Sequence, residues 1–563
     1  MNGLSVFWRG IITAILAVGS LAVWYPAAFV VQHGFDSSAW QDALLLPEQW
    51  FHDLASWQIL PCIGVYVAMV QGKQIAFADG GITAMRALAA VVLGGGAYFI
   101  VGAPRPSLRD WRSVLGRARF ANAAERAAMT AGLELGIDPK TAKPVRVQVE
   151  GNLVSIAPPR TGKTSGLILN NLAMPPEPGV WDGPAVVIDP KGEIYKAVSA
   201  RRRRLGRTVR CLDPFGIVDG RDRWNPLATL DADDTLYLQH LARQLLPAAA
   251  GGSESSQFFR NRAATLFLGA ALGAIRSGKR TPLAAAELLK DLNVLRTSLG
   301  NAPDLASQAV LAFIDSEAKS KEDVISTAEQ AFDWLLDVRM QRLTQDPTFE
   351  LRELLNGDTD LFIVVPSEAT EIISGFLRWL LADLFAVARR HPDPKRRRIL
   401  CIIDEAAQLG RFDAIVKAAG ELPGHGVSLW SFWQSRAQMI DVYGEAGAGT
   451  LMDTAEIVTV SDLPAISAEE RERFTRVLGR YTALLPTVSR AQGEGARDST
   501  SQTLQGVALE DETEDAVLAA DSLVVFANSR RYTRHPIRLR KTIPHGNPRF
   551  AGLLRDVAPV GRS

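Results

Sequence analysis

The chain has 563 residues, of which 47% are hydrophobic and 22% are charged, and its formal net charge is +1. This length exceeds what one compact core requires, so we expect two or three domains in addition to any membrane region. The near-neutral charge excludes a protein that coats itself in nucleic acid through overall charge, so any polyanion must be met by local basic patches.

The cysteines carry no metal or redox motif. Cys62, Cys211 and Cys401 lie far apart without a CxxC spacing, so we predict neither a zinc site nor a disulfide framework. Cys401 lies in the apolar run ILCIID, which is typical of a small buried thiol. The bulk of the chain is therefore expected in the reducing cytosol.

The first residues are expected to form a membrane region. Ile11–Val31 is an uncharged run long enough to cross roughly 30 Å of hydrocarbon as a helix, with a cleaved signal peptide as the alternative. Two further apolar runs, Leu54–Val70 and Ala87–Ala103, have marginal spanning length. We favour two crossings, the first run plus one of the others, and three crossings are the alternative.

The charges that flank these runs predict their orientation. Acidic residues without any Lys or Arg lie between the first two runs, at Asp36, Asp42, Glu48 and Asp53. Arginines follow the third run, at Arg105, Arg109, Arg112, Arg117 and Arg119. The positive-inside rule places these arginines in the cytoplasm and the acidic loop outside. Arg9 favours a cytoplasmic N-terminus, and hence an even number of crossings.

A phosphate-binding loop is predicted after the arginines. Leu153–Ile156 has the pattern of a buried strand, Gly166–Leu172 has that of a helix, and the sequence APPRTGKT begins at Ala157 between them. A strand, a glycine-containing loop and a helix N-terminus in this order form a cradle for phosphate groups. Alanine replaces the usual first glycine, which is tolerable where that position keeps a negative φ.

The residue types in this loop match the chemistry of a nucleoside triphosphate with a magnesium ion. Backbone amides from Gly162 to Ser165 would face the phosphates. Lys163 would neutralise the β and γ oxygens, and the Thr164 hydroxyl would be a ligand of Mg²⁺. We therefore predict ATP and Mg²⁺ as cofactors. The predicted nucleotide-binding residues in this loop are Ala157, Pro158, Pro159, Arg160, Thr161, Gly162, Lys163, Thr164 and Ser165.

Asp189 is a further candidate for the nucleotide pocket. With Lys191 it follows the apolar run AVVI, and an open α/β sheet gathers ligand groups at the carboxyl edge of its strands. The alternative is a surface turn, since Asp-Pro-Lys-Gly is a favourable turn sequence.

Two later strand ends supply candidate catalytic groups. Asp404 and Glu405 follow the apolar run ILCII: Asp404 would hold Mg²⁺ through water, and Glu405 would polarise the attacking water. The alternative is a helix-capping Asp-Glu pair. Gln434 follows the apolar run that begins at Val427, where its amide could sense the γ-phosphate or orient water, or simply be a capped surface group. The predicted catalytic residues are thus Glu405, Lys163 and Gln434.

The remaining pattern predicts a wound parallel sheet with a helical insert. Strand-like runs alternate with helical stretches at Leu361–Val365, Ile399–Ile403, Val427–Phe432, Glu456–Val460 and Leu523–Phe526. Between about residues 230 and 350 such runs are missing, and the segment that begins at Gln257 has apolar residues at helical spacing.

Two basic runs could contact phosphate backbones. The first contains Lys196, Arg201, Arg202, Arg203, Arg204, Arg207 and Arg210. The second contains Arg530, Arg531, Arg534, Arg538, Arg540 and Lys541. Solvated helix faces are the alternative for each run. Only Tyr532 interleaves an aromatic ring, so base-specific readout is not indicated.

Several segments in a fixed order resemble the coupling proteins of type IV secretion and conjugation systems, the TraG/TraD-type ATPases. In chain order they are APPRTGKT, AVVIDPKGE, VRCLDPFG, WNPL, IIDEAAQLG, WQSRAQMIDVYG and LGRYT. The segment ELPGHGVSLW lacks the arginine expected beside its glycine, so no trans-acting arginine is assigned.

This resemblance implies a RecA-like P-loop NTPase core of the α/β class, an inserted all-α domain, N-terminal transmembrane helices and a hexamer around a channel. We predict a membrane region at 1–104, the first part of the RecA-like domain at 105–230, the all-α insert at 231–350, the second part at 351–545 and a tail at 546–563.

The resemblance further implies an ATPase of the bacterial inner membrane with the bulk of the chain in the cytoplasm. It would deliver relaxase-bound DNA or effector proteins to the components of a type IV secretion channel, and would contact nucleic acid without sequence specificity.

Two other function classes are weighed against this interpretation. A DNA pump of the FtsK/HerA type shares the motor core, but the helical insert and the block from DPKGE to WNPL disfavour it. A non-motor recruitment module is disfavoured by the intact Lys163, Thr164, Asp404 and Glu405. An ABC exporter is set aside because no LSGGQ-like signature lies between the two nucleotide motifs.

Overall fold

The computed structural model describes residues 115–246, 254–300, 302, 304–316, 320–393, 395–462, 468–489, 499–509, 521–528 and 531–555. The predicted membrane runs, their inferred orientation and Cys62 lie outside these residues. Within these ranges, no helix combines the length and the hydropathy that a bilayer crossing requires.

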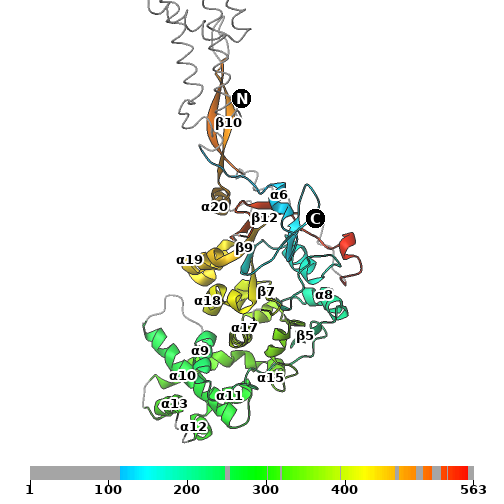
Figure 1. Ribbon diagram of the computed structural model, residues 1–563. Helices are drawn as coiled ribbons and strands as arrows, with labels where there is room; N and C mark the ends of the chain where they lie inside the picture. The colour runs from blue at the N-terminus through cyan, green and yellow to red at the C-terminus, as the bar shows by residue number, and fades with distance from the viewer. Residues whose placement is uncertain are drawn as a thin grey trace, which may run out of the picture. The chain divides into compact units, whose positions relative to one another are not determined.

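An eleven-stranded sheet forms the centre of the described chain, with the strand order β2-β1-β13-β12-β9-β3-β8-β7-β4-β6-β5 (Figure 1). Neighbouring strands from β9 to β5 are parallel, whereas β12, β13, β1 and β2 extend the sheet with antiparallel pairs. The strands are β1 (Leu133–Ile137), β2 (Pro144–Val147), β3 (Asn152–Ile156), β4 (Ala185–Asp189), β5 (Thr208–Leu212), β6 (Thr359–Val364), β7 (Ile399–Ile403), β8 (Val427–Trp433), β9 (Ala455–Val460), β12 (Ser522–Ala527) and β13 (Ile537–Arg540). The predicted α/β fold and the five later predicted strands are confirmed, but the prediction of a wholly parallel sheet is wrong for Leu523–Phe526, because β12 pairs antiparallel with both β9 and β13.

The central strands are buried on both faces, which explains their continuous apolar sequences. Successive residues of β4 pack on opposite sides: Val186 and Ile188 belong to one hydrophobic cluster, and Ala185 and Val187 to another. The first cluster includes residues of α17 (Ser374–Arg390), α18 (Asp413–Glu421), α19 (Arg436–Thr454) and the helical insert. The second includes residues of α8 (Glu193–Arg204) and of the helix after β3. The sheet therefore lies between two helical layers. Cys401 in β7 is a buried free thiol, as predicted, and burial raises its pKa to about 12.

Helices connect the parallel strands. Those of the core are α6 (Ala123–Ala127), the π-type turn Thr164–Leu169 with α7 (Asn170–Leu172), α8 (Glu193–Arg204), α16 (Ser367–Thr370), α17 (Ser374–Arg390), α18 (Asp413–Glu421), α19 (Arg436–Thr454, kinked at Gly444) and α20 (Ala468–Leu478). Short 3₁₀ segments lie at Ala406–Leu409, Leu422–His425 and Pro548–Phe550.

Between β5 and β6 the described chain is helical, as the sequence predicts. The elements are α9 (Thr235–Leu245), α10 (Glu254–Arg276), α11 (Pro282–Lys290), α12 (Leu292–Leu299), α13 (Leu305–Asp315), α14 (Lys321–Glu329), α15 (Val338–Leu343) and 3₁₀ segments at Gln330–Leu336 and Leu351–Asn356. The long helix α10 packs against α9 and α11 to α14, and so forms the centre of this insert (Figure 1).

A separate antiparallel ribbon consists of β10 (Arg480–Ser489) and β11 (Ser499–Ala508). Arg480 pairs with Ala508 at its base and Ser489 pairs with Ser499 at its far end. Neither this ribbon nor the antiparallel strands β1, β2 and β13 was predicted from the sequence.

Several arginines of the first basic run form ion pairs within the protein. Arg202 is fully buried: its Nε donates to Asp360 Oδ2 at 2.7 Å, and its Nη2 donates to Asp360 Oδ1 at 2.6 Å. Arg207 is also buried near Asp360, and Arg210 pairs with Asp222 and Glu353. Arg202, Arg207 and Arg210 are therefore held by carboxylates of the protein and do not form part of a free basic surface, whereas Lys196, Arg203 and Arg204 of the same run are exposed. The contact of this run with phosphate stays a prediction.

The Arg202–Asp360 pair joins α8 to β6 and predicts a large effect of its removal. In Arg202→Met the buried Asp360 carboxylate loses its counter-ion, so the free energy of unfolding should fall by about 3–5 kcal/mol. Arg204→Met is the matched control, because Arg204 is exposed on the same helix, and it should change stability by less than about 0.5 kcal/mol. Urea unfolding of both variants measures the difference, and equal stabilities would contradict the structural role of the pair.

Asp383 is a second buried charge site, within α17. It is only 8% exposed, and its Oδ1 accepts no hydrogen bond from any residue in the described ranges. Burial raises the pKa of this carboxyl well above its usual range, and nearby Arg390 acts against the shift. Arg390 also pairs with Asp234 and lies over the Tyr237 ring, so it offsets the burial of the Asp383 carboxyl only in part.

A raised pKa makes the parent chain lose stability as pH rises. Above about pH 4 the unfolded chain releases the Asp383 proton while the folded chain keeps it. Asp383→Asn cannot ionise, so its free energy of unfolding relative to the parent should increase with pH, by at most about 1.4 kcal/mol per pH unit. Chemical unfolding at pH 5 and pH 8 measures this, with the exposed Asp453→Asn as control. A pH-independent difference for Asp383→Asn would refute it.

Candidate functional site

The loop between β3 and the following helix has the predicted strand, loop and helix context. Ala157 N donates to Trp433 O at 2.9 Å, which continues the pairing of β3 with β8. Ala157 is not among the described non-glycine residues with positive φ, as the replacement of glycine requires. Gly162 has φ of 76°, and Gly166 N donates to Gly162 O at 2.7 Å, so the chain turns directly into the helix that begins at Thr164.

This turn brings Lys163 and Thr164 against the residue that follows β7. Lys163 Nζ donates to Asp404 O at 3.2 Å. Thr164 Oγ1 lies 3.3 Å from each carboxylate oxygen of Asp404. Because β8 alone separates β3 from β7 and all three are parallel, their carboxyl ends meet at one edge of the sheet. The structure therefore brings together the two motifs that the sequence predicts to share one ligand.

The buried environment of Asp404 suits a cation. Burial raises the pKa of its carboxyl, whereas Lys163 and Thr164 act in the opposite direction. A carboxylate beside a hydroxyl supplies the hard oxygen ligands that Mg²⁺ prefers. The described residues contain no group of three or more His, Cys, Asp or Glu that could hold a metal by themselves.

A cavity of about 440 Å³ opens above these residues. The predicted residues in its wall are Pro159, Arg160, Gly162, Lys163, Thr164, Ser165, Glu405 and Gln434. Leu169, Lys191, Glu193, Lys196 and Ala197 complete the wall. The cations Arg160, Lys163, Lys191 and Lys196 outnumber the carboxylates Glu193 and Glu405, so the cavity favours a polyanion.

Glu405 and Gln434 extend from the ends of adjacent strands. β7 and β8 pair in parallel, and each of these residues follows its strand by a short connection. Gln408 Nε2 donates to Glu405 Oε2, and Gln434 N donates to Gln438 Oε1 at 3.0 Å. Ser435 caps α19 by accepting from Gln438 N at 3.2 Å, which fixes where this helix begins. Both side chains line the cavity, and their catalytic roles stay predictions.

Asp189 has a local structural contact. It is buried, its Oδ2 accepts from Tyr195 N at 2.9 Å, and burial together with nearby Asp404 raises its pKa to about 7. Asp189 thus satisfies a backbone donor in the first turn of α8. It does not appear among the residues that line the cavity, so its contact with nucleotide stays a prediction.

Sequence reasoning missed part of the wall that α8 supplies. Glu193 was not singled out, and Lys196 was counted with the first basic run. The signal was present in the segment DPKGE, because a helix that begins directly after a strand end turns its first residues toward the carboxyl edge. Which residues of the helix face the cavity depends on how α8 packs on the sheet.

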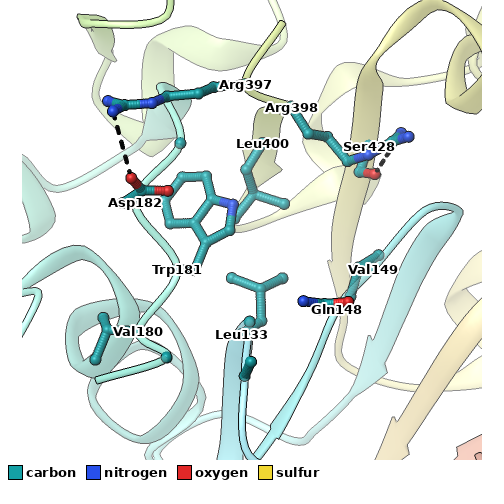
Figure 2. A pocket seen from close by; sticks show the side chains of 14 residues that line it. Leu133, Gln148, Val149, Val180, Trp181, Asp182, Arg397, Arg398, Leu400 and Ser428 are labelled. Carbon is teal, nitrogen blue, oxygen red and sulfur yellow. Dashed lines mark hydrogen bonds and ion pairs between the residues drawn. The ribbon is translucent and has the colours of Figure 1, made fainter. Parts of the chain in front are cut away.

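A second cavity, of about 330 Å³, is lined by residues at the start of β1, between β2 and β3, and before or at the start of β4, β7 and β8 (Figure 2). The Trp181 ring forms one side of it, Arg397 pairs with Asp182 at 3.6 Å, and Arg398 Nη1 donates to Ser428 Oγ at 3.3 Å. None of the predicted site residues lines this cavity. The candidate site is therefore the cavity at the carboxyl edge.

Comparison with known proteins gives a family match. The model described as "Type IV secretory system Conjugative DNA transfer" matches residues 147–555. A "Probable conjugal transfer protein TraG" from Sinorhizobium fredii is 23% identical over 360 residues, which cover 62% of this chain and 56% of the relative. A "Type IV secretion system-coupling protein VirD4" from Bartonella henselae is 23% identical over 334 residues, covering 56% of this chain and 51% of the relative. The chain thus spans about half the length of these curated relatives.

Solved structures show the same fold. The "Bacterial conjugative coupling protein TrwBdeltaN70" in its trigonal form with sulphate has a TM-score of 0.58 and 17% identity, covering 77% of this chain and 95% of that chain. The "Plasmid coupling protein TrwB in complex with ADP and Mg2+" has a TM-score of 0.56 and 17% identity, covering 76% and 94%. The predicted RecA-like P-loop NTPase core is therefore confirmed as a fold.

Proposed function

Since the chain belongs to the type IV secretory system conjugative DNA transfer family, we propose that it is an ATPase that couples ATP hydrolysis to substrate delivery into a type IV secretion channel. One observation carries this proposal: Lys163, Thr164 and Asp404, from two distant parts of the sequence, converge beside a cavity of about 440 Å³ rich in cations. A cavity of this size accommodates a nucleotide.

The proposed ligands are ATP and Mg²⁺. TrwB was solved with ADP and Mg²⁺ and with a non-hydrolysable ATP analogue. In this chain Lys163 would pair with the β and γ oxygens, while the amides from Gly162 to Ser165 would hold the phosphates. Thr164 and Asp404 would hold the ion directly and through water. When bound, Mg²⁺ would neutralise the charge on the β and γ oxygens.

The proposed reaction is hydrolysis of the γ-phosphoryl group. Glu405 would accept a hydrogen bond from the attacking water and orient it toward the γ-phosphorus, and Gln434 would hold the water or sense the γ-phosphate. The new bond forms between the water oxygen and phosphorus while the bond to the ADP oxygen breaks. The adjacent ends of β7 and β8 support this division of roles, because both side chains line the same cavity as Lys163.

The domain organisation supports a coupling protein rather than a DNA pump with the same motor core. Helices α9 to α15 lie within residues 235–343, which supports the proposed all-α insert at 231–350. The proposed parts of the RecA-like core are 105–230 and 351–545. We propose a membrane region at 1–104 and a tail at 546–563, which places the chain in the bacterial inner membrane with its bulk in the cytoplasm. The proposed assembly is a homo-hexamer.

The proposed cargo is relaxase-bound DNA or an effector protein, passed to the components of the secretion channel. Contact with DNA would be without sequence specificity, through phosphates. Because Arg202, Arg207 and Arg210 are bound within the protein, the first basic run offers few cations for this contact. Turnover of ATP by the full chain, with and without DNA or cargo protein, tests the function.

Lys163→Ala tests the site. Loss of the cation that faces the β and γ oxygens should lower ATP turnover by about a hundredfold or more, measured as phosphate release with saturating Mg²⁺. Lys140→Ala is the matched control, since Lys140 is exposed in the turn between β1 and β2, and it should keep parental turnover. A Lys163→Ala chain as fast as the parent would exclude this site.

Glu405→Gln separates hydrolysis from binding. Gln keeps the size of the side chain but accepts a proton poorly, so ATP should bind with parental affinity while single-turnover hydrolysis slows by about 10²- to 10⁴-fold. Equilibrium binding of ATP at low turnover and single-turnover kinetics measure the two quantities. If affinity and rate fell by the same factor, Glu405 would serve binding and another group would position the water.

A further inference from the structure

A buried lysine contacts the phosphate-binding loop from the other end of the sequence. Lys541 follows β13, its side chain is 3% exposed, and its Nζ donates to Thr161 O at 2.6 Å. Its aliphatic stem packs beside Gly166, where an added Cβ would lie 3.3 Å from Lys541 Cβ. Lys541 thus contacts the loop on both sides of Gly162–Thr164. Its position therefore helps to set the backbone conformation of the segment that would bind the phosphates.

Between β9 and β12 the described chain forms α20, β10 and β11, and we term these three elements the hairpin excursion. Ser461 N donates to Ile156 O at 3.0 Å, so the chain leaves β9 directly beside the start of the phosphate-binding loop. It returns in β12, which pairs with β9 in antiparallel register, Val524 opposite Val460. Both roots of the hairpin excursion therefore lie at the edge that carries the candidate site.

Lys541 contacts both roots. Its Nζ lies 3.7 Å from Asp462 Oδ2 at the outgoing root, and its backbone N donates to Asp521 O at 2.5 Å at the returning root. Asp462 has φ of 49°, a left-handed conformation that a neighbouring cation helps to hold. Burial lowers the pKa of the Lys541 ammonium, whereas Asp462 and Asp521 act to raise it. The two carboxylates thus favour the charged form.

We propose that Lys541 is a positioning residue that holds the phosphate-binding loop in its binding shape and couples nucleotide occupancy to the hairpin excursion. The ammonium donates to the Thr161 carbonyl and forms an ion pair with the Asp462 carboxylate, and buried polar networks of this kind respond as a unit. A bound nucleotide draws the amides after Thr161 toward its phosphates and so moves the Thr161 carbonyl. This movement changes how strongly the Lys541 ammonium binds the Asp462 carboxylate. This inference rests on the proposed nucleotide function of the same loop.

Lys541→Met tests the loop contact. Methionine keeps an unbranched stem against Gly166 but removes the ammonium, so the dissociation constant for a non-hydrolysable ATP analogue with Mg²⁺ should rise about 10- to 100-fold. At saturating ATP the kcat should stay near the parental value, because the change weakens binding in the ground state and the transition state alike. Lys279→Met, at an exposed lysine of the insert, is the matched control and should match the parent in both quantities.

Hydrogen exchange in β10 and β11 tests the coupling, using the full chain with and without the analogue at saturation. In the parent the analogue should change exchange in both strands. In Lys541→Met the bound analogue should still protect the phosphate-binding loop from hydrogen exchange, but the exchange in β10 and β11 should no longer change. Asp462→Asn keeps the hydrogen bond from Lys541 to Thr161 and removes the ion pair between Lys541 and Asp462. This variant should bind the analogue with near-parental affinity but lose the change of hydrogen exchange in β10 and β11. It keeps the test valid if Lys541→Met folds poorly.

The outcomes separate the two proposals. Failure of the parent to bind the analogue would overturn the nucleotide function and this inference with it. Parental binding together with an unchanged hairpin response in both variants would overturn only the coupling. Reduced affinity in Lys541→Met without any hairpin response in the parent would likewise overturn the coupling and leave Lys541 as a support of the loop.

Discussion

The close approach of Lys163 and Thr164 to Asp404 is the constraint on which the site depends. Three parallel strands, β3, β8 and β7, end at one edge and bring the loop within 3.3 Å of the carboxylate from a distant part of the chain. A parallel sheet collects the ends of strands that are far apart in sequence, whereas an antiparallel hairpin would have returned each strand to the opposite edge. The same geometry places Glu405 and Gln434 on neighbouring strands with one cavity between them.

Buried charge is the second organising feature. Arg202 and Asp360 are both fully buried and satisfy one another, with Asp360 Oδ1 also accepting from Ala185 N at 2.9 Å. This network ties α8 to β6 and β4, and α8 in turn supplies Lys196 and Glu193 to the cavity wall. A run of arginines that looks like a surface patch in the sequence therefore contributes to the rigidity of the site, because its members point in different directions around a helix.

The helical insert and the hairpin excursion attach to the core in different ways. The insert packs around α10 and shares a hydrophobic cluster with α17, so a continuous apolar contact joins it to the α/β core. The hairpin excursion attaches at two roots beside the phosphate-binding loop, where Lys541 contacts Thr161, Asp462 and Asp521. A conformational change at the carboxyl edge of the sheet would therefore reach the hairpin excursion through a few polar contacts. The insert would instead move together with the core, because the two share a hydrophobic cluster.

The sequence by itself determined the fold class, the central strands, the helical character of the insert and the two nucleotide motifs. These are local properties: runs of Val and Ile specify buried strands, and the spacing in APPRTGKT specifies a loop between strand and helix. Only the tertiary structure decided that Arg202 is buried against Asp360, that Asp189 accepts from the Tyr195 amide of α8, that Lys196 faces the cavity and that Lys541 supports Thr161 from a position 380 residues away. The antiparallel strands β1, β2 and β13 and the ribbon of β10 and β11 likewise escaped prediction. Ile537–Arg540 does alternate apolar and basic residues, but four residues are too few to predict a strand, and its pairing with β1 joins two distant parts of the chain. β1, β2, β10 and β11 pair with neighbours in the sequence, but their sequences lack the long apolar runs or the short glycine turn that would mark a strand or a hairpin.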